Sequence, residues 1–208
     1  MPLNVSVFTV DELRAATDDF DDSRLIGAGG CSLVFRGTLA SGEVVAVKRW
    51  VAGTDAQLSL TELMNELYTL GSIAHPNLLP VLGFVCQPPE LMLVTLHMAR
   101  GSLHDALHGG SAAAAGLDAA WRLSFLSGLA RAIQALHAKN FVHRDVKGAN
   151  VLIGDDGRAV LADAGVARRL IADADAAAAA TGTRVIGTDG YLDPEYQHTS
   201  TLTYKSDV

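Results

Sequence analysis

The spacing of apolar residues divides the chain into a strand-rich first part and a helix-rich second part. Apolar residues cluster over residues 25–26, 33–37 and 44–49, separated by glycine-containing turns, which predicts three strands. Over residues 60–70 they recur with helical spacing, so one helix is expected after these strands. The apolar run at 91–94 predicts a buried strand, one of two further strands that complete a small sheet.

Helical spacing dominates the sequence after residue 102. A short helix is expected over residues 103–107, and a longer one has an apolar face made by Trp121, Phe125, Leu129, Ile133 and Leu136. Residues 111–116 between them are small and rich in alanine, so we expect a surface insertion there. The whole pattern predicts an α+β fold in which a small antiparallel sheet with one main helix precedes a mainly helical part.

A short helix is also predicted ahead of the first strand, within residues 1–22. Thr9 is a favourable N-cap and Glu12 completes a capping box, because each side chain can bond the backbone N–H of the other residue. Leu13 and Phe20 supply apolar contacts. We expect this lead-in segment to be an appendage of the strand-rich part.

Composition narrows the partners and the compartment. The 208 residues are 49% hydrophobic and 19% charged, with a net charge of −7, which is typical of one globular domain or two lobes. Without a stripe of lysine and arginine, nucleic acid is not expected as a partner. Two cysteines, Cys31 and Cys86, provide neither a disulfide framework nor a zinc site, which favours a reducing compartment.

The chain is therefore expected to be cytoplasmic. The sequence has no uninterrupted apolar stretch long enough to span a bilayer, so direct membrane insertion is not expected. A position at the inner face of the plasma membrane would depend on a partner or on sequence outside this chain.

The stretch 143–150, His-Arg-Asp-Val-Lys-Gly-Ala-Asn, combines groups that suit phosphoryl transfer. Asp145 can accept the proton of an attacking hydroxyl, Lys147 can reach a phosphate, and Asn150 can bind Mg²⁺. The stretch matches the kinase catalytic-loop pattern H-R-D-L-x-x-x-N, with Val146 in place of Leu. An isolated His-Arg-Asp could simply cap a turn, but Lys147 and Asn150 in register favour the catalytic interpretation.

A glycine-rich loop and a strand lysine supply phosphate-binding groups. Residues 27–32, Gly-Ala-Gly-Gly-Cys-Ser, resemble the loop that covers nucleotide phosphates in kinases, with Ser32 in the position of a third glycine. Dinucleotide-binding folds use similar glycines before a helix, but a strand follows here, which favours a kinase. Lys48 ends the strand motif Val-Ala-Val-Lys and would hold the α- and β-phosphates. Its expected partner is Glu66, with Glu62 one turn earlier as the alternative.

Asp163 begins an Asp-Ala-Gly sequence where kinases carry Asp-Phe-Gly, so Asp163 would bind Mg²⁺ together with Asn150. Ala164 replaces the aromatic side chain that helps to separate active from inactive states, which leaves the metal ligand intact and the switch less well defined. A turn residue before Gly165 is the alternative interpretation of Asp163.

Together these motifs resemble plant receptor-like and receptor-like cytoplasmic kinases of the interleukin-receptor-associated-kinase and Pelle type, over nearly the whole chain. Residues 8–20, 75–84 and 187–196 are similar to the lead-in, H-P-N-L and G-T-x-G-Y-L-D-P-E-Y segments of that family. The resemblance implies a signalling kinase that uses ATP and Mg²⁺, phosphorylates a protein substrate and has a receptor or co-receptor kinase as a partner. Lys147 resembles the serine/threonine-specific pattern, and Thr188 would help to form the site for the substrate hydroxyl, so the resemblance implies serine and threonine rather than tyrosine as the target.

The resemblance also assigns roles to individual residues. Thr95 would be the gatekeeper, and residues 96–98 would form the hinge that binds adenine. Arg144 would pair with a phosphate on Thr183 or, as second choice, on Thr181. The expected catalytic residues are Asp145, Lys147, Lys48 and Glu66, the metal ligands are Asn150 and Asp163, and the nucleotide-binding residues are Ile26, Gly27, Gly29, Val34, Ala46, Lys48, Thr95, Met98 and Leu152.

The resemblance implies a bilobal kinase-like fold with an incomplete C-lobe, because residues 204–208 are similar to the start of the helix at the centre of the large lobe. We therefore expect weak or no activity from this chain in isolation. A nucleotide-binding pseudokinase or scaffold is the alternative, favoured by Ser32 and Ala164 and opposed by the intact catalytic set. The expected boundaries are a lead-in at 1–22 and a kinase domain at 23–208, with an N-lobe at 23–95, a hinge at 96–100 and a partial C-lobe at 101–208.

Overall fold

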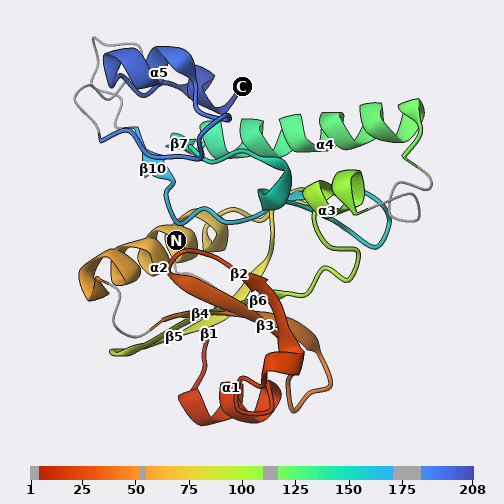
Figure 1. Ribbon diagram of the computed structural model, residues 1–208, viewed down its shortest axis with the longest axis vertical. Coiled ribbons are helices and arrows are strands. Elements are labelled where there is room, and N and C mark those ends of the chain that lie inside the picture. Colours follow the sequence, from red (N-terminus) through yellow and green to blue (C-terminus); the bar gives the residue numbers. More distant parts are fainter. Residues whose placement is uncertain (1–4, 52–54, 110–116, 171–183) are drawn as a thin grey trace. The chain divides into compact units, whose positions relative to one another are not determined.

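The computed structural model describes residues 5–51, 55–109, 117–170 and 184–208 (Figure 1). The chain divides into two compact units, which are described separately below. The first comprises Met1–Ser72 and Leu79–His97, and the second comprises Ile73–Leu78 and Met98–Val208. The predicted insertion at 111–116 and the predicted phosphorylation sites Thr181 and Thr183 lie outside the described residues.

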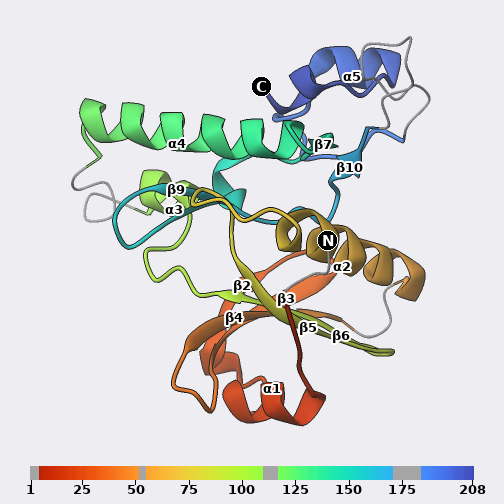
Figure 2. The ribbon, with the colours of Figure 1, turned by 180° about the vertical axis from the view of Figure 1, so that it is seen from behind.

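A six-stranded sheet with the order β1-β5-β6-β4-β3-β2 forms the centre of the first unit (Figure 2). The five expected strands are present and pair antiparallel. The edge strand β1 pairs in parallel with β5 and was not predicted, because two residues are too few to show an alternation. The strands are β1 (Ser6–Val7), β2 (Leu25–Ala28), β3 (Ser32–Thr38), β4 (Val44–Trp50), β5 (Val81–Gln87) and β6 (Glu90–Leu96).

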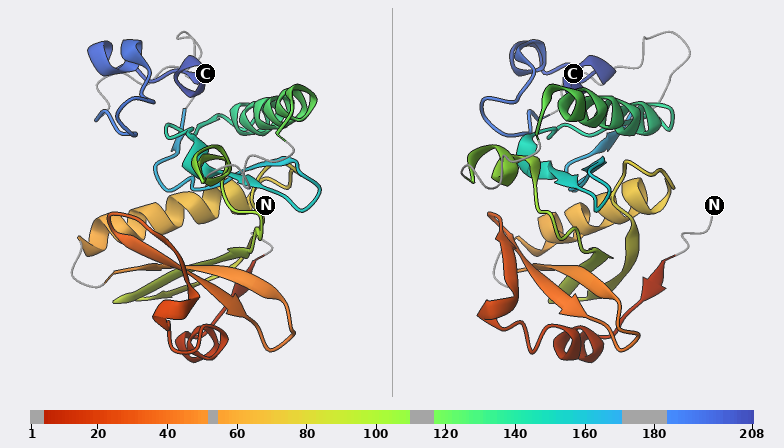
Figure 3. Two further views of the ribbon diagram at one scale, coloured as in Figure 1. Left: turned by 45° about the vertical axis from the view of Figure 1, so that its right-hand side comes forward. Right: turned by 90° about the vertical axis from the view of Figure 1, so that its right-hand side faces the viewer.

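Helix α2 (Ala56–Gly71) packs against β5 and β6 of this sheet (Figure 3). It begins earlier than the apolar spacing predicts, because Asp55 caps it by accepting hydrogen bonds from the backbone N–H groups of Gln57 and Leu58. Leu63 and Leu67 of the helix are buried together with Trp50, Leu91 and Leu93 of the sheet. This apolar cluster fixes the helix on one face of the sheet.

The lead-in segment is part of the core of the first unit. Helix α1 (Val10–Ala16) begins with the predicted capping box, in which the Glu12 carboxylate accepts hydrogen bonds from the Thr9 backbone and hydroxyl at 2.7 and 2.8 Å. These bonds lower the pKa of Glu12, since they stabilise its ionised form. Leu13 is fully buried among residues of β3, β4, β5 and β6. The appendage expected from sequence thus supplies core residues.

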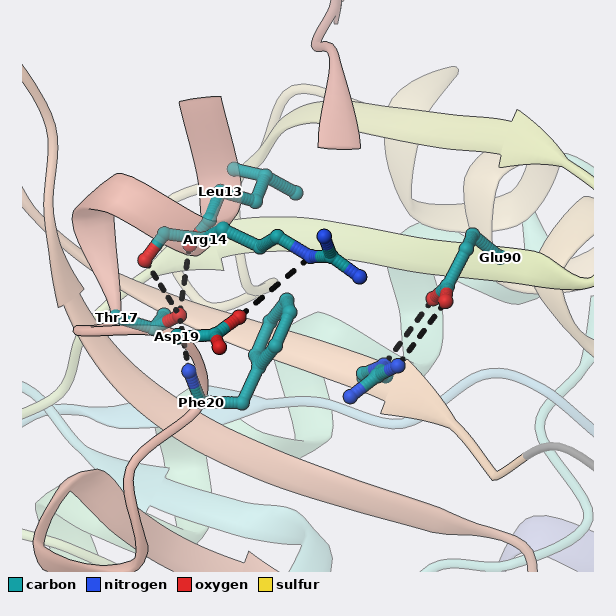
Figure 4. A network of polar contacts seen from close by, with 7 residues as sticks. Leu13, Arg14, Thr17, Asp19, Phe20 and Glu90 are labelled. Atoms are coloured by element: carbon teal, nitrogen blue, oxygen red, sulfur yellow. Dashed lines mark hydrogen bonds and ion pairs between the residues drawn. The ribbon is translucent and has the colours of Figure 1, made fainter. Parts of the chain in front are cut away.

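A tight turn and the short 3₁₀ helix η1 (Asp22–Arg24) connect α1 to the sheet. Figure 4 shows the polar contacts of this turn around Thr17 and Phe20. Asp18, Asp19 and Phe20 all have positive φ, at 53°, 58° and 58°, which is an unfavourable conformation for residues other than glycine. The Thr17 hydroxyl accepts a hydrogen bond from the Phe20 backbone N–H and donates one to the Leu13 carbonyl. The Phe20 ring then packs beneath the guanidinium of Arg49, 4.4 Å from the ring centroid.

The second unit is mainly helical, as the sequence predicts. The long helix α4 (Ala119–His137) packs against β9 (Ala159–Leu161) and β7 (Phe141–Val142), and its buried residues include Phe125 and Leu136 of the predicted apolar face. Leu123 and Leu126, on its other side, are exposed. The elements of this unit are α3 (Leu103–His108), α4 (Ala119–His137), β7 (Phe141–Val142), η2 (Gly148–Asn150), β8 (Val151–Ile153), β9 (Ala159–Leu161), β10 (Arg168–Arg169), α5 (Pro194–Thr199) and η3 (Tyr204–Asp207).

The second unit also contains two short antiparallel pairs of strands. Strands β8 and β9 form one pair, and β7 and β10 form the other. Within the described ranges, none of the helices has both the length and the apolar character that crossing a membrane requires.

Gly83 on β5 leaves room for the unpredicted strand β1. A Cβ at this position would collide with the Ser6 carbonyl oxygen and the Phe8 ring. We expect Gly83→Ala to detach β1 and to lower the free energy of unfolding by about 1–3 kcal/mol, the usual effect of forcing an extra methyl group into a packed site. Urea denaturation measures the free energy, and limited proteolysis within residues 5–20 reports detachment.

Gly30→Ala is the matched control, because a Cβ there has no neighbouring atom within 4 Å. If both alanine variants unfold at the same urea concentration, the close packing of β1 on β5 does not contribute to stability.

Candidate active site

The predicted phosphate-binding loop is the hairpin between β2 and β3. Its ends are joined by a hydrogen bond from the Gly29 N–H to the Ser32 carbonyl, 2.8 Å long. Ser32 is the first residue of β3, so a serine in the position of the third glycine is compatible with the hairpin. A Cβ on Gly30 would meet open space, which leaves the backbone at the tip of the loop accessible.

Lys48 and Glu66 form an ion pair within the first unit. Lys48 Nζ lies 2.8 Å from Glu66 Oε2, and the side chains are only 17% and 3% exposed. Glu62, the alternative partner, instead accepts a hydrogen bond from the Trp50 indole. Glu66, which the sequence favoured as the partner of Lys48, is thus the glutamate that forms the ion pair.

Some of the predicted nucleotide-binding residues belong to the first unit and others to the second. Ala46 and Thr95 are directly opposite each other on β4 and β6, and Val34 is opposite Lys48 on β3 and β4. The predicted gatekeeper Thr95, which is buried, thus lies two residues along β6 from Leu93, the residue opposite Lys48. Ile26, Gly27, Gly29, Val34, Ala46, Lys48 and Thr95 belong to the first unit, and Met98 and Leu152 belong to the second.

In the second unit, the Asp145 carboxylate is held by three side chains. Thr188 donates its hydroxyl proton to Oδ1 at 2.6 Å, and Asn150 donates through Nδ2 to Oδ2 at 2.9 Å. Lys147 Nζ lies 2.7 Å from Oδ2 and also donates to the Thr188 hydroxyl at 2.7 Å. Each carboxylate oxygen has two lone pairs, so Oδ1 keeps one that can accept a further proton.

This arrangement gives Asp145 a fixed orientation. Its side chain is 12% exposed, so it is sheltered from solvent but can still be reached. A carboxylate oriented in this way, with an ammonium group beside it, can receive a proton from a hydroxyl group. The cluster unites residues from the catalytic loop with Thr188, which is 43 positions away from Asp145 in the sequence.

Asp207 of η3 anchors the backbone of the catalytic loop. Its carboxylate accepts hydrogen bonds from the N–H groups of His143 and Arg144, each 2.8 Å long. The same carboxylate lies 2.8 Å from His137 Nε2, a contact with a residue of α4 that the sequence did not single out. The His137 contact has no sequence signal, because residues 137 and 207 come together only in the folded chain.

His143 is buried, and both of its ring nitrogens form hydrogen bonds with backbone groups. Nδ1 lies 3.3 Å from the Asp145 backbone N–H, which must donate, so Nδ1 is the acceptor. Nε2 then carries the proton and donates to the Ala162 carbonyl at 3.0 Å. His143 thus ties the loop to the residue immediately before Asp163.

Arg144 also has a positive φ, of 71°, and its side chain donates through Nε to the Val166 carbonyl at 2.7 Å. Burial lowers the pKa of Arg144, whereas interactions with Tyr196 and Asp207 raise it and the nearby Arg168 lowers it. The pairing of Arg144 with phosphorylated Thr183 or Thr181 stays a prediction, because both threonines lie outside the described residues.

Asn150 and Asp163 carry the hard oxygen ligands that Mg²⁺ prefers. Asn150 donates through its amide nitrogen to Asp145, which leaves the amide oxygen as the atom available to a cation. The Asn150 carbonyl accepts a hydrogen bond from the Ala162 N–H, which brings Asp163 to the same end of the β8-β9 pair. Over the described parts of the chain, no cluster of three or more His, Cys, Asp or Glu residues could hold a metal. Asn150 and Asp163 thus offer two oxygen donors of the kind that suits Mg²⁺.

The chain belongs to the protein kinase family. Residues 21–208 match the family described as protein tyrosine and serine/threonine kinase. The fold, with its antiparallel-rich sheet, single large helix and mainly helical second unit, agrees with that assignment.

Similar proteins come from plants. The chain is 41% identical to calmodulin-binding receptor-like cytoplasmic kinase 2 of Arabidopsis thaliana, over 97% of this chain and 49% of that protein. It is 39% identical to the leucine-rich repeat receptor protein kinase MSL1 of Oryza sativa, over 96% of this chain and 14% of that protein. PTI1-like tyrosine-protein kinase 2 of Arabidopsis thaliana is 36% identical over the whole chain and 58% of its own length. The chain thus spans about half, or less, of the first two relatives.

The anchoring by Asp207 can be tested through the amides that it holds. Asp207→Ala leaves the His143 and Arg144 N–H groups without their acceptor, which we expect to loosen the loop by about 1–3 kcal/mol of local opening free energy. Hydrogen exchange of these two amides, measured by NMR, should become about 5- to 150-fold faster.

Asp193→Ala is the control, since Asp193 also accepts a backbone hydrogen bond, from Glu195, but at the start of α5. Unchanged exchange of the His143 and Arg144 amides in Asp207→Ala would show that the loop does not depend on this carboxylate.

Proposed function

We propose that this chain is the catalytic part of a serine/threonine protein kinase that transfers the γ-phosphoryl group of ATP to protein hydroxyl groups in signal transduction. The observation that carries the proposal is the arrangement around Asp145, whose carboxylate is oriented by Lys147, Thr188 and Asn150. The ion pair between Lys48 and Glu66 adds the second set of groups that a kinase requires.

In the proposed reaction, the hydroxyl oxygen of the substrate forms a bond to the γ-phosphorus while the bond from that phosphorus to the β-phosphate oxygen breaks. ADP leaves with the bonding electrons, and the hydroxyl proton passes to Asp145 Oδ1. Lys147 and Lys48 neutralise phosphate charge, so catalysis consists mainly of positioning and electrostatic stabilisation.

Asn150 and Asp163 are the proposed ligands of Mg²⁺, which when bound supplies charge neutralisation at the β- and γ-phosphates. The proposed ATP-binding residues are those predicted from sequence, with Glu66 orienting Lys48. Support for nucleotide use comes from membership of the kinase family and from the oxygen donors of Asn150 and Asp163.

The preference for serine and threonine rests on Lys147 and Thr188. Their side chains meet at 2.7 Å next to Asp145, where a small aliphatic hydroxyl would have to enter. The names of similar proteins include both a serine/threonine-protein kinase and a tyrosine-protein kinase, so names do not decide the target. Parallel assays with serine-, threonine- and tyrosine-containing peptides would.

Protein substrates and a receptor or co-receptor kinase are the proposed partners, acting in the cytoplasm or at the inner face of the plasma membrane. The support is the set of similar proteins, which are named as receptor-like cytoplasmic kinases and as receptor kinases.

A pseudokinase that binds nucleotide without transfer is the second candidate. It is favoured by Ala164, which is completely buried at the position where an aromatic side chain would otherwise help to set the active state. The candidate differs from the first only in turnover, and the same assay separates the two.

Radiolabelled phosphate transfer to a generic protein substrate, and to the chain itself, tests the proposal. We expect Lys48→Met and Asp145→Asn to lower transfer at least about 100-fold, because each removes a group that acts on the transferring phosphate or on its acceptor. Chelation of Mg²⁺ should abolish the signal. Equal incorporation by all three proteins would rule out intrinsic catalysis and favour the pseudokinase.

A further inference from the structure

A second polar contact links helix α2 to strand β4 beside the ion pair of Lys48 and Glu66. The Trp50 indole Nε1 donates a hydrogen bond to Glu62 Oε2 at 3.0 Å. Trp50 is only 2% exposed, so its indole has little access to water as a substitute acceptor. A cation–π contact connects the two pairs, because Lys48 Nζ lies over the Trp50 ring at 5.2 Å from its centroid.

The distance between Lys48 and Trp50 along β4 is close to the distance between Glu62 and Glu66 along α2. Lys48 and Trp50 are two residues apart on β4, which is about 6.6 Å along a strand. Glu62 and Glu66 are four residues apart on α2, which is about 6 Å along a helix. Lys48 contacts Glu66 and Trp50 contacts Glu62, so the strand and the helix run in opposite directions. The two contacts therefore lie one after the other along the helix and the strand.

The backbone of α2 packs mainly against β5 and β6. Its link to β4 is therefore made by long side chains, which include those of the two polar contacts. The apolar contacts of Leu63 and Leu67 hold the helix on the sheet, but such contacts are not directional. One polar contact to β4 would still permit the helix to rotate or slide about that point. A second contact one turn away removes this freedom, since hydrogen bonds require a defined distance and angle.

We propose that Trp50 and Glu62 are positioning residues that keep Glu66 in contact with Lys48, and so keep Lys48 oriented toward the nucleotide phosphates. The proposal rests on the kinase function proposed above. Loss of the Trp50–Glu62 hydrogen bond removes a polar contact between helix α2 and strand β4, and the fraction of molecules with an intact Lys48–Glu66 pair falls. Neither Trp50 nor Glu62 touches the substrate in this account.

Three single substitutions separate the hydrogen bond from side-chain bulk. Glu62→Met removes the acceptor at similar length, and Trp50→Phe removes the donor while it keeps an aromatic ring. Glu62→Gln keeps an acceptor oxygen and is the matched control. We expect Glu62→Met and Trp50→Phe each to lower kcat about 5- to 30-fold, with KM for ATP changed less than about twofold, and Glu62→Gln to stay within about threefold of the wild type.

The double variant Trp50→Phe/Glu62→Met should lose no more activity than either single variant, because both remove the same bond. If the wild-type chain is active and Glu62→Met retains the kcat of Glu62→Gln, the proposal is wrong although the kinase function stands. Additive losses in the double variant would also contradict it.

A measurement that does not depend on activity covers the case in which the wild-type chain transfers no phosphate, an outcome that would overturn the proposed function alone. The chain has two tryptophans, Trp50 and Trp121, so two indole N–H signals are expected by NMR. The Trp50 indole and the backbone amides of residues 62–67 should exchange at least about fivefold faster in Glu62→Met than in Glu62→Gln, with Trp121 unchanged as the internal reference. Equal exchange in the two variants would show that the contact does not hold the helix.

Discussion

The carboxylate of Asp207 is the contact on which the catalytic loop depends. It accepts hydrogen bonds from two consecutive backbone N–H groups, those of His143 and Arg144, and it also contacts His137. Arg144 has a left-handed backbone conformation, which is costly without such support. Because the side chain of Asp207 is fully shielded from solvent, these bonds operate in a low-dielectric setting where they are stronger than in water. Asp145 directly follows these two residues, so its orientation depends on Asp207, a residue that is distant in sequence but in contact with the loop.

The first unit uses a different device to orient its charged groups. Its lysine is held on a strand and its glutamate on a helix, and the two elements are connected by side chains whose spacing agrees along both backbones. The apolar cluster supplies the stabilising burial, whereas the polar contacts decide the rotation of the helix. Trp50 takes part in both kinds of contact, since its ring is buried in the apolar cluster and its indole N–H bonds Glu62 next to the ion pair.

The lead-in segment shows how a core can extend beyond the part of a chain that a family match covers. The kinase match begins at residue 21, yet Leu13 is completely buried and Phe20 packs edge-on against Phe35 at 5.4 Å. Three successive residues with positive φ bring Phe20 to this position, and its contacts with Phe35 and Arg49 offset that conformational cost. The segment is thus a structural part of the first unit, which the capping signal of Thr9 and Glu12 could indicate only as a local helix.

The sequence by itself determined the elements with strong periodicity and the chemical types of the candidate site. The strands at 33–37 and 44–49, helix α2 and the apolar face of α4 follow from spacing that any fold must bury, and the catalytic loop carries its chemistry within eight consecutive residues. Only the tertiary structure showed that Glu62 bonds the Trp50 indole, that His137 contacts Asp207, and that β1 pairs in parallel with β5. These contacts unite residues that are distant in sequence, and their selection depends on packing geometry, which short-range periodicity does not encode.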